Sequence, residues 1–153
     1  MEQSAAIEIR SGTWGIPEIE GFLHSAVIPM RLATQGSGWP LVQSLWFLFD
    51  DSELWCCTQQ DSVVAARLRK EPRCAFEIAG DDPPYRGVRG RGVASFDRGS
   101  ASNVLDRLIG RYLTTGEAGL GPWLRSRVSD EVAICIGSLT VSSWDYSSRM
   151  KST

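Results

Sequence analysis

Three short strand-like segments joined by two tight turns constrain the fold of this chain more than any other feature of its sequence. The segments span residues 29–35, 41–49 and 53–58. Glycine and serine fill the first turn, and two aspartates with a serine fill the second; these are residue types that tight turns favour. Because strands joined by such short turns run antiparallel, the sequence predicts an antiparallel meander over residues 29–58.

The rest of the chain continues the sheet-rich pattern. Further strands are predicted at residues 73–79, 85–96 and 131–144, and helices beginning at residue 17, at 62–70, at 101–114 and near 121–127. Six tryptophans and fifteen glycines among 153 residues agree with this, because helices penalise glycine whereas sheets accommodate aromatic side chains. We expect a single domain over residues 1–153, with flexible or arm-like ends at 1–12 and 147–153.

Composition argues against membrane-spanning, secreted, nucleic-acid-binding and metal-binding proteins. The longest apolar run, residues 45–49, is far too short to cross a bilayer, and the N-terminus lacks the basic start and apolar segment of a secretory signal. A net charge of −2 and a pI of about 5.4 disfavour nucleic-acid binding. The four cysteines form no C-x-x-C pair and one histidine accompanies them, so no metal site is predicted. We expect a cytoplasmic protein with reduced, mostly buried cysteines and no membrane or nucleic-acid partner.

A candidate anion site lies where the strand 53–58 ends and the next helix begins. Thr58 closes the strand, and Asp61 and Ser62 precede the helix. Hydroxyl groups, free backbone N–H groups and the positive end of a helix dipole would meet there. The simpler interpretation is that Asp61 or Ser62 only caps the helix. Basic residues outnumber acidic ones over residues 62–153, which places an anionic ligand in this part of the chain rather than in the acidic part before it.

A second candidate is the glycine- and arginine-rich strand at residues 85–92. With a period of two, Arg89 and Arg91 share one face with Gly87. Glycines allow close approach of a flat ligand or another backbone, and arginines could hold a phosphate. The segment is also similar to a single RNA-binding RGG tract, although the acidic composition disfavours that interpretation.

Aromatic residues form a third candidate. Trp46, Phe47 and Phe49 lie on the second strand of the meander, and Trp144 lies near the end of the last strand. Such residues usually belong to a core or a subunit interface, and they also suit a slot for a planar ring. One histidine cannot complete a Ser-His-Asp or Cys-His set. No catalytic residue is therefore assigned, and an enzyme of this sequence would take its reactivity from a bound cofactor.

Several short motifs follow one another in a definite order from residue 18 to residue 93, with a weaker continuation to residue 150. They are RLAT at 31–34, WP at 39–40, the strand 41–49 with its acidic turn, LWCCT at 54–58, the helix start 62–68, EPR at 71–73 and PPYRGVRGRG at 83–92. Their order and spacing resemble the pyridoxamine 5′-phosphate oxidase-like family of FMN-binding split β-barrels.

This resemblance implies a mainly β fold, a six-stranded antiparallel split barrel with flanking helices. It implies a homodimer with two flavin sites at the subunit interface and a small-molecule substrate. The strand around residues 43–47 would pass along the isoalloxazine ring, Trp144 of the partner chain would cover the ring, and the strand end and helix start would hold the phosphate. The cofactor-binding residues are then Gln43, Ser44, Leu45, Trp46, Phe47, Thr58, Ser62, Arg67, Arg89 and Trp144.

The sequence departs from the family pattern at the helix start. Valines occupy positions 63 and 64, where the family often has basic residues, and Val42 replaces a frequent arginine. Arg67 would take over the phosphate, or else Arg86, Arg89 or Arg91 would. The predicted function is an FMN-binding oxidoreductase that transfers hydride between flavin and a small organic substrate. The alternatives are an F420-dependent reductase on the same fold and a non-catalytic flavin-binding, haem-binding or stress-response module.

Overall fold

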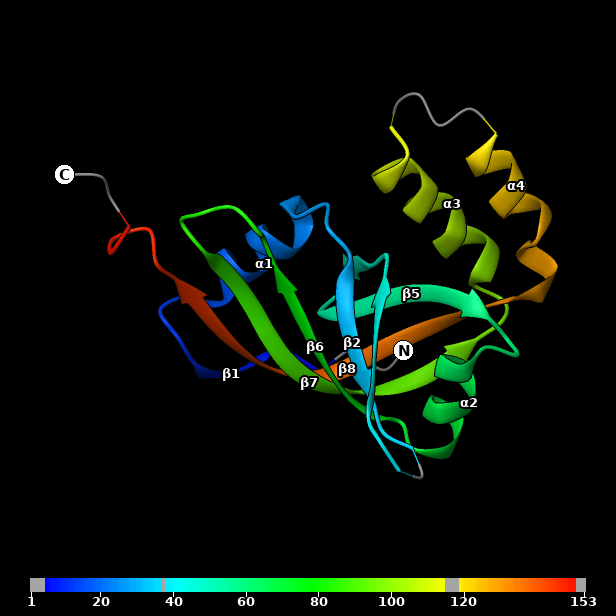
Figure 1. Ribbon diagram of the computed structural model, residues 1–153, viewed down its shortest axis with the longest axis horizontal. Helices are drawn as coiled ribbons and strands as arrows, with labels where there is room; N and C mark the ends of the chain where they lie inside the picture. Colours follow the sequence, from blue (N-terminus) through cyan, green and yellow to red (C-terminus); the bar gives the residue numbers. More distant parts are fainter. Residues whose placement is uncertain (1–4, 37, 115–118, 151–153) are drawn as a thin grey trace.

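The computed structural model describes residues 5–36, 38–114 and 119–150. The elements, shown in Figure 1, are β1 (Glu8–Ser11), α1 (Ile16–Ser25), β2 (Met30–Thr34), β3 (Leu41–Leu45), β4 (Leu48–Asp50), β5 (Glu53–Gln59), α2 (Val63–Lys70), β6 (Arg73–Ala79), β7 (Arg86–Asp97), α3 (Ala101–Tyr112), α4 (Leu120–Ser126), a 3-10 turn (Val128–Asp130) and β8 (Glu131–Asp145). Among these described segments, no helix is both long and apolar enough to cross a membrane.

One sheet organises the molecule. Its strands follow the order β3-β2-β6-β7-β8-β5-β4, with β1 added in parallel to β8. The first and last strands of this order, β3 and β4, are separated in the chain only by Trp46 and Phe47. The sheet therefore curls until its two ends meet in one segment, as a barrel requires. The predicted mainly β, antiparallel split barrel is confirmed. The sheet has eight strands rather than six because β1 joins it and the predicted strand 41–49 is two strands.

The prediction of an unbroken strand over residues 41–49 is wrong, and the cause lies in α3. The chain leaves its partner β2 after Leu45 and joins β5 from Leu48 onward. At the break, the Tyr112 hydroxyl accepts a hydrogen bond from the Phe47 N–H at 3.2 Å and donates one to the Ile28 carbonyl at 2.8 Å. A side chain from α3 thus satisfies backbone groups that the interrupted ladder leaves behind.

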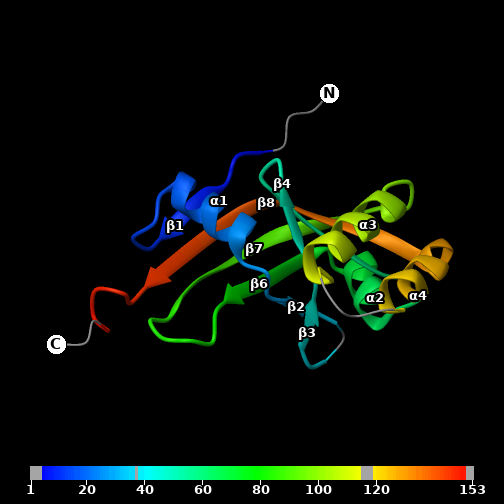
Figure 2. The same cartoon turned by 90° about the horizontal axis from the view of Figure 1, so that it is seen from above.

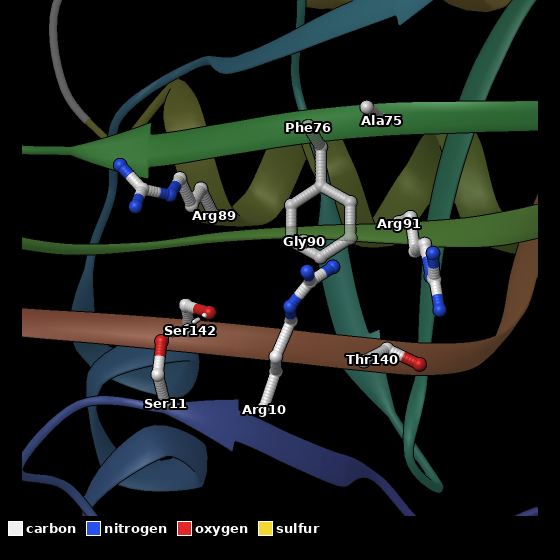
Figure 3. A pocket seen from close by; sticks show the side chains of 9 residues that line it. All are labelled: Arg10, Ser11, Ala75, Phe76, Arg89, Gly90, Arg91, Thr140 and Ser142. Atoms are coloured by element: carbon white, nitrogen blue, oxygen red, sulfur yellow. Dashed lines mark hydrogen bonds between the residues drawn. The ribbon is translucent and has the colours of Figure 1, made fainter.

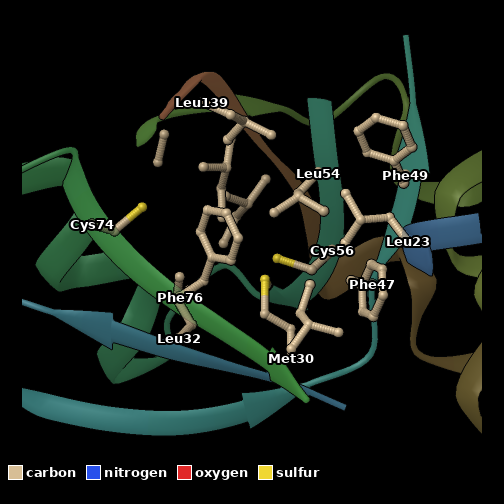
Figure 4. Close-up of a cluster of buried hydrophobic side chains, with 14 of the residues drawn as sticks. Leu23, Met30, Leu32, Phe47, Phe49, Leu54, Cys56, Cys74, Phe76 and Leu139 are labelled. Atoms are coloured by element: carbon tan, nitrogen blue, oxygen red, sulfur yellow. The ribbon is translucent and has the colours of Figure 1, made fainter. Parts of the chain in front are cut away.

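The core fills the inside of the curled sheet. Alternation along β6 buries Cys74, Phe76 and Ile78 and leaves the intervening side chains outside. Fully buried side chains from other elements meet them, and Figure 4 shows Leu23 from α1, Leu32 from β2 and Leu54 from β5 among this group. Burying each such side chain contributes about 1.5–3 kcal/mol, so the barrel interior dominates stability.

The adjacent cysteines of β5 project to opposite faces of the strand. Cys56 is fully buried in the barrel, whereas Cys57 faces α3 and contacts the Ala101 carbonyl. Burial raises the pKa of the Cys57 thiol to about 12 and that of Cys74 to about 11. Both groups are therefore neutral thiols at physiological pH.

The helices divide the molecule into two ends. Viewed from above, α2, α3 and α4 gather at one end of the sheet, while α1 and β1 lie toward the other (Figure 2). Each end carries a cavity of its own.

Candidate functional site

A cavity of about 330 Å³ lies at the helical end, between β3, β5, α3 and α4. Its lining is mainly apolar and consists of Ser44, Leu45, Trp46, Cys57, Leu105, Leu108, Leu120, Leu124 and Glu131. The volume lies within the range of small-molecule sites. Three residues predicted to contact a flavin ring, Ser44, Leu45 and Trp46, therefore line the same cavity.

The aromatic wall of this cavity is held in place by the seam of the barrel. Trp46 stacks on Tyr112 with ring centroids 5.0 Å apart and an interplanar angle of 4°. The hydroxyl of Tyr112 is bound at the strand break, so the same residue fixes both the backbone and the Trp46 ring. A planar wall that is positioned before any ligand arrives suits a flat ring system.

Two polar groups stand in the otherwise apolar lining. The Ser44 hydroxyl lies at the exposed end of β3. On the β8 side, burial raises the pKa of Glu131 above its usual range, although nearby Arg127 opposes this and Asp130 adds to it. A few polar groups in an apolar cavity are typical of sites that orient a ligand through its edge.

The residues of the predicted anion site lie at the junction of β5 and α2. Thr58 Oγ1 donates to Ser62 Oγ at 2.9 Å, and Ser62 Oγ accepts from the Ala65 N–H at 3.1 Å. Ser62 is therefore the N-cap, as the simpler interpretation requires. The N–H groups of Val63 and Val64 begin the helix and have no carbonyl one turn earlier to bind.

The junction and the cavity lie on opposite sides of β5 and meet at its end. Figure 1 shows α3 on one side of β5 and α2 on the other. Glu131, which lines the cavity, pairs with Gln59, the last residue of β5. Glu131 thus places one wall of the cavity beside the end of β5, next to the junction.

One arginine beside the junction is not among the residues predicted to hold a phosphate. Arg67, the predicted phosphate ligand, donates to the Trp39 carbonyl at 3.1 Å and lies against Gly36 of the β2–β3 turn. Arg69 instead donates to the Gln60 carbonyl at 2.6 Å, beside the junction. The available signal was spacing, because Arg69 follows Ser62 by seven residues, about two helical turns, and so shares its face.

The other predicted residues lie away from this cavity. Phe47 is fully buried in the core, and Gln43 is half-buried on β3 without lining the cavity. Arg89 on β7 lies with its guanidinium carbon 5.8 Å from the ring centre of Trp144 on β8. That pair belongs to the other end of the sheet, so one chain does not bring it to Trp46.

No protein-family model matches the chain, and no curated protein sequence matches it. Solved structures do. A conserved hypothetical protein from Mycobacterium tuberculosis is 26% identical, with 100% of this chain and 96% of that chain covered and a TM-score of 0.76. An F420 reductase is 22% identical, with 75% and 89% covered and a TM-score of 0.61. A pyridoxamine 5′-phosphate oxidase candidate from Listeria innocua is 17% identical, with 78% and 90% covered and a TM-score of 0.60.

Proposed function

Because this chain has the split-barrel fold of pyridoxamine 5′-phosphate oxidase-like proteins, we propose that it is a flavin-binding oxidoreductase. The cofactor is FMN, with its ring in the cavity between β3, β5, α3 and α4. The observation that carries the proposal is the preset aromatic wall of Trp46 in a cavity that Glu131 borders beside the end of β5.

The residues present fit such a cofactor at both of its ends. Trp46 offers a planar face to the ring, and leucines of α3 and α4 exclude water around it. The phosphate would lie beside the Thr58 and Ser62 hydroxyl groups, where the α2 dipole favours negative charge. Arg69, held on the Gln60 carbonyl beside the junction, would supply positive charge in place of the basic residues missing at 63 and 64.

Bound FMN would accept and donate hydride, and the chain would supply position and environment. The Ser44 hydroxyl is placed to hydrogen-bond the ring edge. Burial raises the pKa of Glu131, which lines the cavity, above that of an exposed glutamate. The leucine side chains of α3 and α4 make most of the lining around the ring apolar.

A second copy of the chain would complete the site. Large apolar side chains are exposed on the outside near α2, with exposed fractions of 89% for Trp39, 65% for Val42 and 62% for Val63. Arg67 connects two of them, because it shares a helix face with Val63 and binds the Trp39 carbonyl. Exposed apolar clusters of this kind mark interaction surfaces. We therefore propose that the protein is a homodimer.

The deazaflavin F420 is the second candidate cofactor. Positions 63 and 64 carry no positive charge at the helix start, and an F420 reductase shares the fold. A phosphate held less tightly at this junction would shift the preference from FMN toward a cofactor with other anchoring groups.

Titration of the purified protein with FMN and with F420 tests both candidates. We expect one of them to change its visible absorbance and quench tryptophan fluorescence at micromolar concentration. Trp46→Leu should weaken binding at least about tenfold, or about 1.4 kcal/mol. Trp123→Leu is the matched control, because Trp123 is 51% exposed on α4 and does not line the cavity.

Leu124→Trp offers an independent check, since a larger side chain would fill the cavity without removing the Trp46 wall. This variant should lose binding and keep its circular dichroism spectrum. If neither cofactor responds to the unaltered protein, or if the filled cavity binds as well as the open one, the proposal is overturned.

A further inference from the structure

A second cavity, of about 390 Å³, lies at the opposite end of the sheet from the proposed flavin site. It opens on the outer face of β1, β6, β7 and β8 and is lined by Arg10, Ser11, Ala75, Phe76, Arg89, Gly90, Arg91, Thr140 and Ser142 (Figure 3). It shares no lining residue with the flavin cavity. Three of its nine lining residues are arginines, which sets it apart from the apolar cavity.

The fold brings the three arginines to one place. Arg89 and Arg91 are two residues apart on β7, so their side chains leave the same face of the sheet. Arg10 comes from β1, where the pairing register with β8 shifts between Ile9 and Ser11. Figure 3 shows Arg10 reaching across β8 to Gly90, with Arg89 and Arg91 on either side of that glycine.

The floor of this cavity is apolar and glycine makes it so. A Cβ at Gly90 would lie 2.5 Å from the Thr140 carbonyl and 2.8 Å from Cζ of Phe76. Only a residue without a side chain leaves the Phe76 ring room beside β7. Hydroxyl groups stand on the remaining side, where Ser11 Oγ donates to Ser142 Oγ at 2.9 Å.

The positive charge in this cavity is not balanced within the described residues. None of the three arginines forms an ion pair there. The facing strands contribute two carboxylates, Glu77 opposite Arg89 and Glu8 opposite Thr140, and one more cation, Arg31 opposite Glu77. Four cations therefore face two anions. Like charges held this close repel one another, and a bound anion would relieve the repulsion.

We propose that this cavity binds a small organic anion that carries a phosphate or several carboxylates. Arginine presents its donors in a planar fork that matches both groups in a bidentate way. The Thr140 and Ser142 hydroxyl groups add neutral donors. Within one chain, this site shares no lining residue with the flavin cavity.

Isothermal titration calorimetry tests the proposal with two probes. Pyrophosphate tests binding through phosphate groups, and citrate tests binding through carboxylates. We expect binding of at least one of them, with an affinity that falls as salt rises. The double variant R10Q/R91Q should bind at least about tenfold more weakly. Arg98→Gln is the matched control, since Arg98 is exposed and lies outside the cavity. Equal affinities in the double variant and the control would overturn the site.

Thr140→Glu provides a test that does not depend on the arginine variants folding. A carboxylate at this position stands among the arginines, so it should abolish anion binding and raise the melting temperature at low salt. An unchanged or lower melting temperature with anion binding retained would overturn the proposal. Titration with FMN in saturating pyrophosphate tests whether the anion and the flavin occupy different cavities. Unchanged FMN affinity is expected, and competition would mean that the anion occupies the flavin site instead.

Discussion

At the scale of single residues, Tyr112 joins three separate segments of the chain. Its hydroxyl binds the Phe47 N–H and the Ile28 carbonyl, and its ring carries Trp46. Tyr112→Phe would keep the ring and leave two backbone groups without their partner. We expect a loss of about 1–3 kcal/mol in the free energy of unfolding, measured by urea denaturation. Tyr146→Phe on the exposed C-terminal segment should change it little, and an equal effect of both would contradict this role.

Two glycine-to-alanine substitutions are expected to change the free energy of unfolding in opposite directions. A Cβ at Gly92 would lie 2.6 Å from Cγ2 of Ile136 and 2.8 Å from the Gly137 carbonyl, whereas one at Gly110 in α3 meets nothing within 4 Å. Gly92→Ala should therefore destabilise by about 1–3 kcal/mol. Gly110→Ala should stabilise by about 0.5–1 kcal/mol, because alanine favours helix. Thermal unfolding of both variants checks the pair, and a stable Gly92→Ala would show that β7 and β8 are less tightly packed.

Glu131 gives a pH dependence with a definite sign. Burial raises its pKa in the folded protein above the ordinary 4.5, so the folded state binds the proton more tightly than the unfolded state. Below pH 4.5 both states are protonated and the group contributes nothing. As pH rises through the raised pKa, the ionised group costs stability. Glu131→Gln should thus match the unaltered protein near pH 4 and exceed it at pH 7 in denaturation midpoint, and the reverse trend would contradict the assignment.

At the scale of elements, α1 depends on an arginine from α3. Arg111 donates to the carbonyls of Leu23, His24 and Ala26 at 3.0, 2.8 and 2.6 Å, which are C-terminal groups that the helix itself cannot satisfy. Arg111→Ala should destabilise the protein by about 1.5–3 kcal/mol and speed amide hydrogen exchange at the end of α1. Arg107→Ala, which breaks an exposed ion pair with Asp50, should cost less than about 1 kcal/mol. Equal exchange in both would rule out this cap.

The same scale shows what the sequence could and could not predict. Hairpin turns and alternation located the strands, because these signals are local and repeat along each strand. The break at Trp46 and Phe47 escaped detection, since residues 45–49 are apolar on both sides of it. Its cause, Tyr112, lies 65 residues away. β1 was predicted only as an arm or edge, because all four of its side chains are exposed and carry no apolar pattern.

Only those residues of the candidate site that are neighbours in sequence could be grouped together by local signals. Ser44, Leu45 and Trp46 are neighbours in sequence and share a cavity, and Thr58 with Ser62 forms the expected hydroxyl pair. The leucines of α3 and α4 reach the cavity only through tertiary packing. The choice between Arg67 and Arg69 depended on where each side chain finds an acceptor, which spacing alone did not decide.

At the scale of the whole molecule, the proposed homodimer gives a prediction of its own. Trp39→Ser combined with Val63→Ser removes apolar area that a second copy would cover. We expect sedimentation equilibrium to show dimers of the unaltered protein and monomers of the double variant at micromolar concentration. The control is Val27→Ser, also exposed but on the segment after α1. A monomeric unaltered protein would contradict the dimer.

The place of β8 in the sheet has a consequence for how the chain is made. β8 is last in the sequence, yet it lies between β7 and β5 and pairs with both. During synthesis, the chain up to residue 130 has unpaired edges at β5 and β7 and a barrel interior exposed to solvent until β8 has been made. Unpaired edges of this kind are templates for association between chains. β8 therefore closes the barrel, and a chain that stalls during translation before β8 would expose two unpaired strand edges.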